Sequence, residues 1–278
     1  MKLYTFIITV LIISAVQTQA ENGKPFKQQH LSVLQSAKAI DSLPRLKPTF
    51  SFSNTFSNSY MWRGLVFNEG LMLQPSATVG YGHFELNGWS NVAAIETGGH
   101  EFVPEIDFNL GYTYEAKNYG VKPQANFYFY PANWQHISTL ELGVEAFYEI
   151  ENLGFYINPN VDVADNYGGV YVDYGIYKSG DLSKRVSYDA RMLLGWGNKR
   201  FCEHYQTKPE SIETNVDPKR LLTQDLKSMR LQLTADYQVS ERFSIQPQLV
   251  AFRNFMLGYA FDKHLVRANA SVTCSYAF

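Results

Sequence analysis

The sequence is poor in cysteine, in net charge and in long apolar runs, and each shortage excludes a class of protein. Two cysteines in 278 residues cannot build a disulfide-rich scaffold or a four-ligand zinc site. Lys and Arg number 24 against 26 Asp and Glu, and without basic tracts we expect no nucleic-acid partner. After residue 20 no apolar run approaches the roughly 20 residues that a spanning helix needs. A helical membrane protein is therefore excluded.

Aromatic residues are the abundant class. The 19 Tyr, 19 Phe and 4 Trp make up 15% of the chain, while charged residues make up only 18%. So much aromatic surface would collapse in water, which excludes a disordered chain.

The first 48 residues differ from the rest of the chain. Residues 1–20 combine an early Lys2, an apolar stretch and a small-residue stop at Ala20, which indicates a secretory signal peptide. Residues 21–48 form a polar N-terminal segment in which apolar residues recur at helical spacing, so we expect at most one short helix there. A mobile periplasmic tail and a plug inside a pore are the two interpretations of this segment.

From residue 49 to residue 278 the sequence alternates between apolar and polar residues. One run places Ile106, Phe108 and Leu110 on one face of a strand and Asp107 and Asn109 on the other. About a dozen such runs follow one another, each of about 10–14 residues, which suits strands that cross a bilayer at a tilt. The pattern predicts an all-β protein, a transmembrane antiparallel β-barrel of about 12 strands.

The connectors between these runs alternate in length, which supports a barrel with short periplasmic turns and longer outer loops. The short connectors are residues 82–83, 117–120, 151–152, 179–184 and 240–242, and the long ones are residues 58–70, 95–102, 131–136, 164–168, 198–227 and 254–265. We therefore expect a monomer in the outer membrane of a Gram-negative bacterium, in contact with outer-membrane lipid and lipopolysaccharide. The terminal Phe278 is in register with its strand and suits recognition by the barrel assembly machinery.

In a barrel the polar face of each strand points into the lumen, so the lining is predictable. The expected acidic lining is Glu85, Glu105, Asp107, Glu115, Glu141, Glu145, Glu149, Asp162, Asp173, Asp189 and Asp236, and the expected basic lining is Lys122, Arg185, Arg191, Arg230, Arg242 and Arg267. This excess of acids predicts a porin-like channel for small polar solutes or ions with a weak cation preference. The alternative is a lumen closed by salt bridges, in a barrel that serves as a structural or adhesive surface protein.

Two sets of residues fit the alternation poorly. Prolines fall inside expected strands, and apolar residues fall on the polar face, so we expect bulges near some of them. These residues are Pro75, Pro123, Pro159, Pro247, Trp89, Phe147, Leu193 and Phe252.

An enzyme is a weaker interpretation. His100, His136, His204 and His264 fall in expected outer loops, where a rim hydrolase would carry its catalytic groups, but no local motif of such enzymes is present. We expect no catalytic residues, no metal and no cofactor. A soluble β-sandwich is the remaining alternative for the fold.

The first two expected hairpins carry a recognisable string. It runs from Asn54 to Tyr60, continues with Trp62-Arg63-Gly64, and ends with Pro75 to Gly82 and with Gly88-Trp89-Ser90-Asn91-Val92. It resembles the TorF family of outer-membrane porin-like proteins, which share a Tyr-x-x-Arg-Gly element followed by a Gly-x-Trp-x-Ser-Asn-like element.

The likeness covers mainly residues 54–131, where Tyr130-Pro131 also resembles a pair in that family, and it departs where Gly88 and Trp89 adjoin directly. The resemblance implies a barrel with a transport role and no catalytic residues. On physical grounds we expect Arg63 to anchor the first outer loop by pairing with carboxylates at the rim, while Gly64 permits a tight turn.

Overall fold

The computed structural model describes residues 47–96, 104–131, 138–151, 153–206, 225–254 and 266–278. The expected signal peptide and nearly all of the segment 21–48 lie outside these residues. Within the described ranges, no helix is long and apolar enough to cross a membrane.

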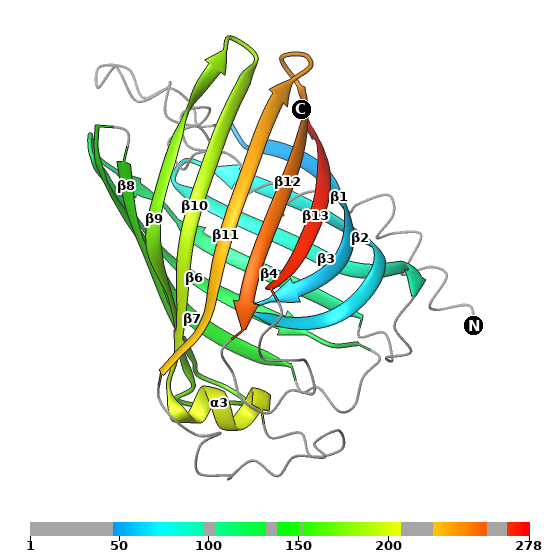
Figure 1. Cartoon of the computed structure of the whole chain (residues 1–278). Helices are drawn as coiled ribbons and strands as arrows, with labels where there is room; N and C mark the ends of the chain where they lie inside the picture. Colours follow the sequence, from blue (N-terminus) through cyan, green and yellow to red (C-terminus); the bar gives the residue numbers. More distant parts are fainter. Residues whose placement is uncertain (1–46, 97–103, 132–137, 152, 207–224, 255–265) are drawn as a thin grey trace.

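Antiparallel strands form one closed sheet (Figure 1). Their bounds are β1 Thr49–Trp62, β2 Leu65–Tyr81, β3 Phe84–Glu96, β4 Glu105–Tyr112, β5 Tyr114–Glu115, β6 Tyr119–Phe129, β7 Thr139–Ile150, β8 Leu153–Asp162, β9 Val170–Ser183, β10 Val186–Gly197, β11 Asp225–Gln238, β12 Phe243–Asn254 and β13 Val266–Ala277. β4 and β5 follow one another and both pair with β6, so together they form one crossing and the barrel has 12 strands. Pairing of β1 with β13 closes the barrel.

The exterior of this barrel is apolar and its interior is polar. Phe108 and Leu110 are 46% and 51% exposed, whereas Asn87 on the neighbouring strand is buried inside the barrel. Asp107 and Asn109, on either side of Phe108 in the sequence, line the lumen. A soluble sandwich would bury the apolar face instead, so the predicted transmembrane barrel is confirmed.

Short turns and long connectors lie at opposite ends of the barrel. The strands are joined at one end by residues 82–83, 116–118, 151–152, 184–185 and 239–242. In Figure 1 this end carries the C-terminus, and helix α3 (Lys199–Gln206), part of the connector between β10 and β11, lies at the opposite end.

The first outer connector departs from the prediction. A long loop is expected over residues 58–70, but β1 continues to Trp62 and β2 begins at Leu65. Only Arg63 and Gly64 form the turn, and both have positive φ, at 50° and 83°. Positive φ at both central residues defines a type I′ turn, which matches the twist of a hairpin.

Bulges occur at other places than the poorly fitting residues suggest. The register shifts lie at Ser57/Ser59 and Tyr60/Met61 in β1, at Leu71/Met72 in β2, at Val186/Ser187 and at Gly195/Trp196. The four prolines cause no register shift, but each pairs on one side only, opposite Asn54, Val144, Val172 and Val272, and lies in a gap of the register on its other side. The apolar residues of the polar face, such as Trp89 and Phe147, are buried inside the barrel and pack there.

Candidate functional site

The tip of the β1–β2 hairpin reaches across the lumen to the opposite wall. Arg63 donates two hydrogen bonds to Glu141 on β7, with Nη1···Oε1 at 2.7 Å and Nη2···Oε2 at 2.6 Å. In the strand order, β7 lies almost opposite β1. The relative exposures of the two residues are 8% and 2%, so this bidentate ion pair is shielded from solvent.

Aromatic rings surround the Arg63 guanidinium. Its carbon lies 4.2 Å from the centre of the Trp62 ring, 4.6 Å from that of Tyr171 and 5.6 Å from that of Phe201. These distances allow cation–π attraction, which strengthens when the rings exclude water. Trp62 also packs edge-on against Tyr128 of β6, with the ring centres 6.0 Å apart. The tip is therefore held by four separate elements, β6, β7, β9 and α3.

Helix α3 brings Phe201 to this cluster because Asn198 caps its N-terminus. The Asn198 side-chain oxygen accepts hydrogen bonds from the backbone N–H groups of Phe201 (2.9 Å) and Val170 (3.0 Å). Asn is a preferred N-cap residue, since its side chain satisfies an otherwise unpaired helical N–H. The second bond ties the helix to the start of β9.

The base of the hairpin packs on a second aromatic group. Tyr60, Met72 and Trp89 are buried together, with Phe67 against them. The ring of Tyr60 lies 5.6 Å from that of Phe67 and 5.4 Å from that of Trp89. This packing fixes the direction in which the hairpin leaves the barrel wall.

Many of the acidic residues expected on the lumen face are buried inside the barrel or line its central cavity, and several have basic partners. Besides Glu141, the ion pairs are Glu85 with Lys122 at 3.1 Å, Asp189 with Arg191 at 2.5 Å and Asp173 with Arg230 at 3.7 Å. Asp236 is buried, and Asp107 and Glu145 line the central cavity.

Several of the acids, among them Glu105, Glu145 and Asp162, accept hydrogen bonds from hydroxyl groups. The Tyr130 hydroxyl donates to Glu105 (3.0 Å) and the Tyr156 hydroxyl donates to Glu145 (3.2 Å). Asp162 accepts from the Thr139 hydroxyl (2.7 Å) and from two backbone N–H groups, so it holds the connector between β8 and β9.

The basic residues are placed less well by the sequence pattern. Arg191 and Arg230 face the lumen, and Arg267 lies where β13 begins, beside the contact between β13 and β1. The pattern places Arg242 on the lumen face, but it lies in the exposed turn of residues 239–242. The pattern also places Arg185 on the lumen face, but the structure puts it in the exposed turn of residues 184–185. The reason is that β9 and β10 extend to Ser183 and Val186, so the hairpin ends later than expected.

Between the hairpin tip and the short-turn end lies a polar cavity of about 350 Å³. Amide side chains dominate the wall formed by β3, β4, β6 and β8. They are Asn87, Asn109, Gln124, Asn126, Asn158 and Asn160. Within the described part of the chain, Asp107 Oδ1 and Asn109 Oδ1 are buried oxygens without a hydrogen-bond donor. The amide groups of this wall offer donors and acceptors to a polar solute, whereas the two buried oxygens of Asp107 and Asn109 are out of its reach.

Aromatic rings also narrow the lumen toward the short-turn end. Phe147 and Tyr177 are buried together, with Tyr156 packed against them. The Tyr177 ring lies directly on Gly154 of β8, where an added Cβ would fall 2.0 Å from the ring. The Tyr177 hydroxyl donates to Glu149 at 3.0 Å, which holds the ring against the inner wall over Gly154 of β8.

The residues considered for catalysis or metal binding do not gather in the described ranges. There, no group of three or more His, Cys, Asp or Glu side chains is arranged to hold a metal ion. His204 lies 3.6 Å from Asp165. His100, His136 and His264 lie outside the described residues.

The sequence pattern predicts few of the main features of this site. It identified Arg63, Gly64 and Glu141, but it placed the arginine in a loop at the rim. The signals that could have indicated the hairpin were Gly64, at the second central position of a type I′ turn, and the aromatic residues that flank the turn.

Comparison with known proteins identifies the architecture. No family model and no curated protein matches the chain. Among solved structures, the NanC porin aligns over 81% of this chain and 98% of its own, with 8% identity and a TM-score of 0.52. The chain has the fold of an outer-membrane porin. The KdgM porin also aligns, over 84% of this chain and 99% of its own, with 8% identity and a TM-score of 0.48. The COG4313 outer membrane channel from Pseudomonas putida F1 aligns over 87% of this chain and 99% of its own, with 10% identity and a TM-score of 0.42.

Proposed function

We propose that the protein is an outer-membrane channel for the passive passage of small polar solutes or ions. The observation that carries the proposal is the polar cavity inside a barrel with an apolar exterior, covered on one side by the Arg63 hairpin tip. A wall of amides can exchange hydrogen bonds with a hydrated solute without trapping it, since each bond contributes little net free energy. Passage requires the tip to move away from Glu141, so the tip acts as a constriction.

We also propose a weak cation preference. Four acids have a basic partner, and Glu145, which lines the central cavity and accepts a hydrogen bond from the Tyr156 hydroxyl, adds negative charge to the lumen. Excess negative charge inside a narrow lumen favours cations over anions.

The setting and the family belong to the same proposal. The protein would act as a monomer in the outer membrane of a Gram-negative bacterium, surrounded by lipid and lipopolysaccharide and assembled through Phe278. Membership of the TorF family is supported by Tyr60, Arg63 and Gly64, which form the base and the turn of the hairpin tip.

The test is conductance in a planar bilayer with refolded protein. The proposal expects discrete current steps in potassium chloride and, under a salt gradient, a reversal potential that shows cation selectivity. The competing function, a sealed structural or adhesive barrel, is favoured by the ion pairs and rings that fill the lumen. It predicts no current in the native protein and none in an Arg63→Ala variant, and that result would overturn the channel.

A further inference from the structure

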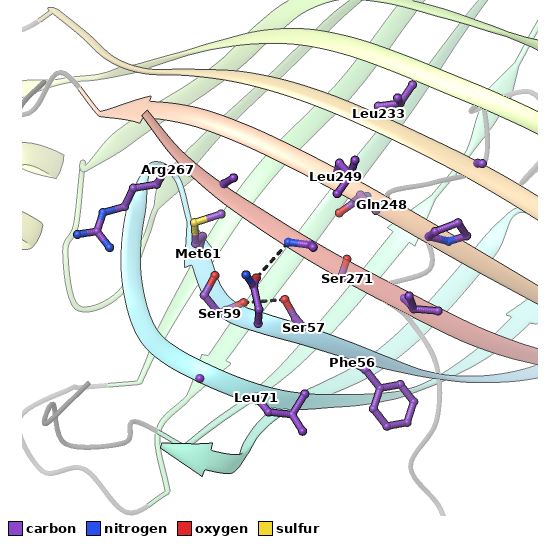
Figure 2. Close-up of a pocket in the computed structure, with 17 residues that line it drawn as sticks. Phe56, Ser57, Ser59, Met61, Leu71, Leu233, Gln248, Leu249, Arg267 and Ser271 are labelled. Carbon is purple, nitrogen blue, oxygen red and sulfur yellow. Dashed lines mark hydrogen bonds between the residues drawn. The ribbon is translucent and has the colours of Figure 1, made fainter. Parts of the chain in front are cut away.

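The contact between the first and last strands of the barrel is incomplete at the long-connector end. The register of β1 with β13 ends at Ser57↔Ser271. The register of β1 with β2 continues to Trp62↔Leu65, and that of β12 with β13 continues to Arg253↔Val266. β1 leaves the wall at the Ser57/Ser59 bulge, and Figure 2 shows its ribbon bending away from β13 at Ser59. We call the region where the two strands separate, residues 57–61 and 266–271, the seam.

Side chains connect the two strands across the seam in place of backbone pairs. The Asn58 side-chain oxygen accepts a hydrogen bond from the Ala270 N–H at 3.0 Å. The Asn269 side-chain nitrogen donates to the Ser57 hydroxyl at 2.7 Å and to the Ser59 carbonyl at 2.8 Å. In lipid an unpaired backbone group is costly. These side chains therefore satisfy some of the backbone groups that a continued β1–β13 ladder would pair.

A groove of about 970 Å³ lies on the outer wall beside the seam (Figure 2). Small side chains on neighbouring strands hollow the wall, and larger apolar side chains border it. The small side chains are Ala235, Ala268 and Ala270, and the larger ones are Leu71, Leu233 and Leu249. Leu249 is 60% exposed and Leu233 is 53% exposed, as expected for the lipid-facing surface. The groove is therefore continuous with the surface that contacts lipid tails.

One end of the groove is polar. Ser57, Ser59 and Ser271 line both the groove and the central cavity of the lumen, so the two spaces meet at the seam. Arg267 is the one charged side chain among the described residues that line the groove. In Figure 2 it lies at the same end as Ser59 and Met61, away from Phe56.

From this arrangement we infer that the groove binds a long-chain fatty acid. The acyl chain lies along the alanine-lined floor, and the carboxylate lies at the seam, within the field of Arg267 and beside the serine hydroxyls. A single chain suits an apolar groove in a lipid-facing wall, because the wall makes dispersion contacts with the chain along its length. A positive side chain at one end selects an acid over a neutral lipid. This inference does not depend on the proposed channel.

Photolabelling tests the site. The full chain is refolded into phosphatidylcholine nanodiscs with a palmitic acid that carries a diazirine on its chain, and the labelled residues are mapped after irradiation. The expected labels lie around the groove, on β1, β2, β11, β12 and β13. Labelling spread around the barrel in proportion to exposure would overturn the inference.

Two substitutions fill the groove, and a matched one does not. Ala270→Phe and Ala235→Phe each place a ring on the floor, so groove labelling should fall about tenfold, which corresponds to about 1.4 kcal/mol. Ala125→Phe adds the same ring to the lipid-facing side of β6, where Ala125 pairs with Leu142, and should leave groove labelling unchanged. Heat-modifiable electrophoretic migration checks that each variant is folded. Unchanged labelling in both groove variants would refute the site.

A separate measurement tests whether the carboxylate of the fatty acid lies at the seam. Arg267→Gln should reduce labelling by the fatty acid several-fold more than labelling by a fatty alcohol with the same diazirine chain. An equal effect on the two probes would refute the carboxylate at the seam while leaving the test of the groove intact.

Discussion

Replacing Arg63 by alanine should open the constriction. The substitution removes one partner of a buried ion pair and leaves the Glu141 carboxylate, only 2% exposed, without its guanidinium. Removing one partner of such a pair costs about 3–5 kcal/mol. Because a displaced tip would let water reach Glu141, that loss falls on the closed arrangement. At 1.4 kcal/mol per factor of ten, the ratio of displaced to closed tip rises roughly 10²- to 10⁴-fold.

The assay is single-channel recording of the native protein and of Arg63→Ala under identical conditions. We expect a higher open probability and a larger mean conductance in the variant. Glu141→Gln should act in the same direction, since it removes the charge that holds the guanidinium. Arg185→Ala is the matched control, because Arg185 lies in an exposed turn at the other end of the barrel. If native protein and Arg63→Ala conduct equally, the tip is not the constriction and the reasoning fails.

Three further predictions concern the barrel itself. Gly154→Ala should lower the unfolding free energy in lipid by about 1–3 kcal/mol, since its Cβ would fall 2.0 Å from the Tyr177 ring, and the loss should shrink in a Tyr177→Ala background measured by urea unfolding. Leu110→Arg should cost about 2–4 kcal/mol in the same assay because it places a charge on the lipid-facing wall, and a neutral effect would contradict the assigned exterior. Phe278→Ala should lower the yield of folded barrel in cells but not the yield of unassisted refolding, and equal losses in both would refute recognition by the assembly machinery.

The barrel was predictable because side-chain alternation is a local property of a strand. Phe108 and Asp107 are neighbours in sequence, and a strand must point them to opposite faces whatever its partners are. Only the chemistry of the two faces was then needed to choose between a core and a lipid-facing wall. The strand count followed from the same repeat.

The hairpin tip was not predictable in the same way because bulges interrupt the alternation. At the Ser57/Ser59 and Tyr60/Met61 shifts β2 carries one more residue than β1, and in this irregular stretch Tyr60 lies inside the barrel, against the parity of the preceding residues. Leu71/Met72 shifts the register of β2 in a similar way. Because the alternation is lost over residues 58–70, the sequence pattern there predicts a loop.

A local sequence pattern also could not predict the partner of Arg63. Glu141 is 78 residues away in sequence, and the two meet only because the closed barrel places β7 across from β1. The apolar aromatic residues on the polar face were not predictable from a local pattern for the same reason, because their packing partners lie on other strands. Trp89 packs with Tyr60 and Met72 inside the lumen, as a residue would in an ordinary protein core.

The bend in β1 at Ser57/Ser59 produces both the seam and the constriction. By leaving the wall there, the strand exposes one side of β13 and carries Arg63 to the opposite side of the lumen. The neutral hydrogen bonds across the seam contribute about 0.5–1.5 kcal/mol each, less than the cost of disrupting the buried ion pair. The tip can therefore swing on the seam once the ion pair is released, while the register from Ser51↔Ala277 to Ser57↔Ser271 keeps the barrel closed. Opening of the lumen should thus leave the unfolding of the barrel unchanged, which separates a moving tip from a general loosening of the fold.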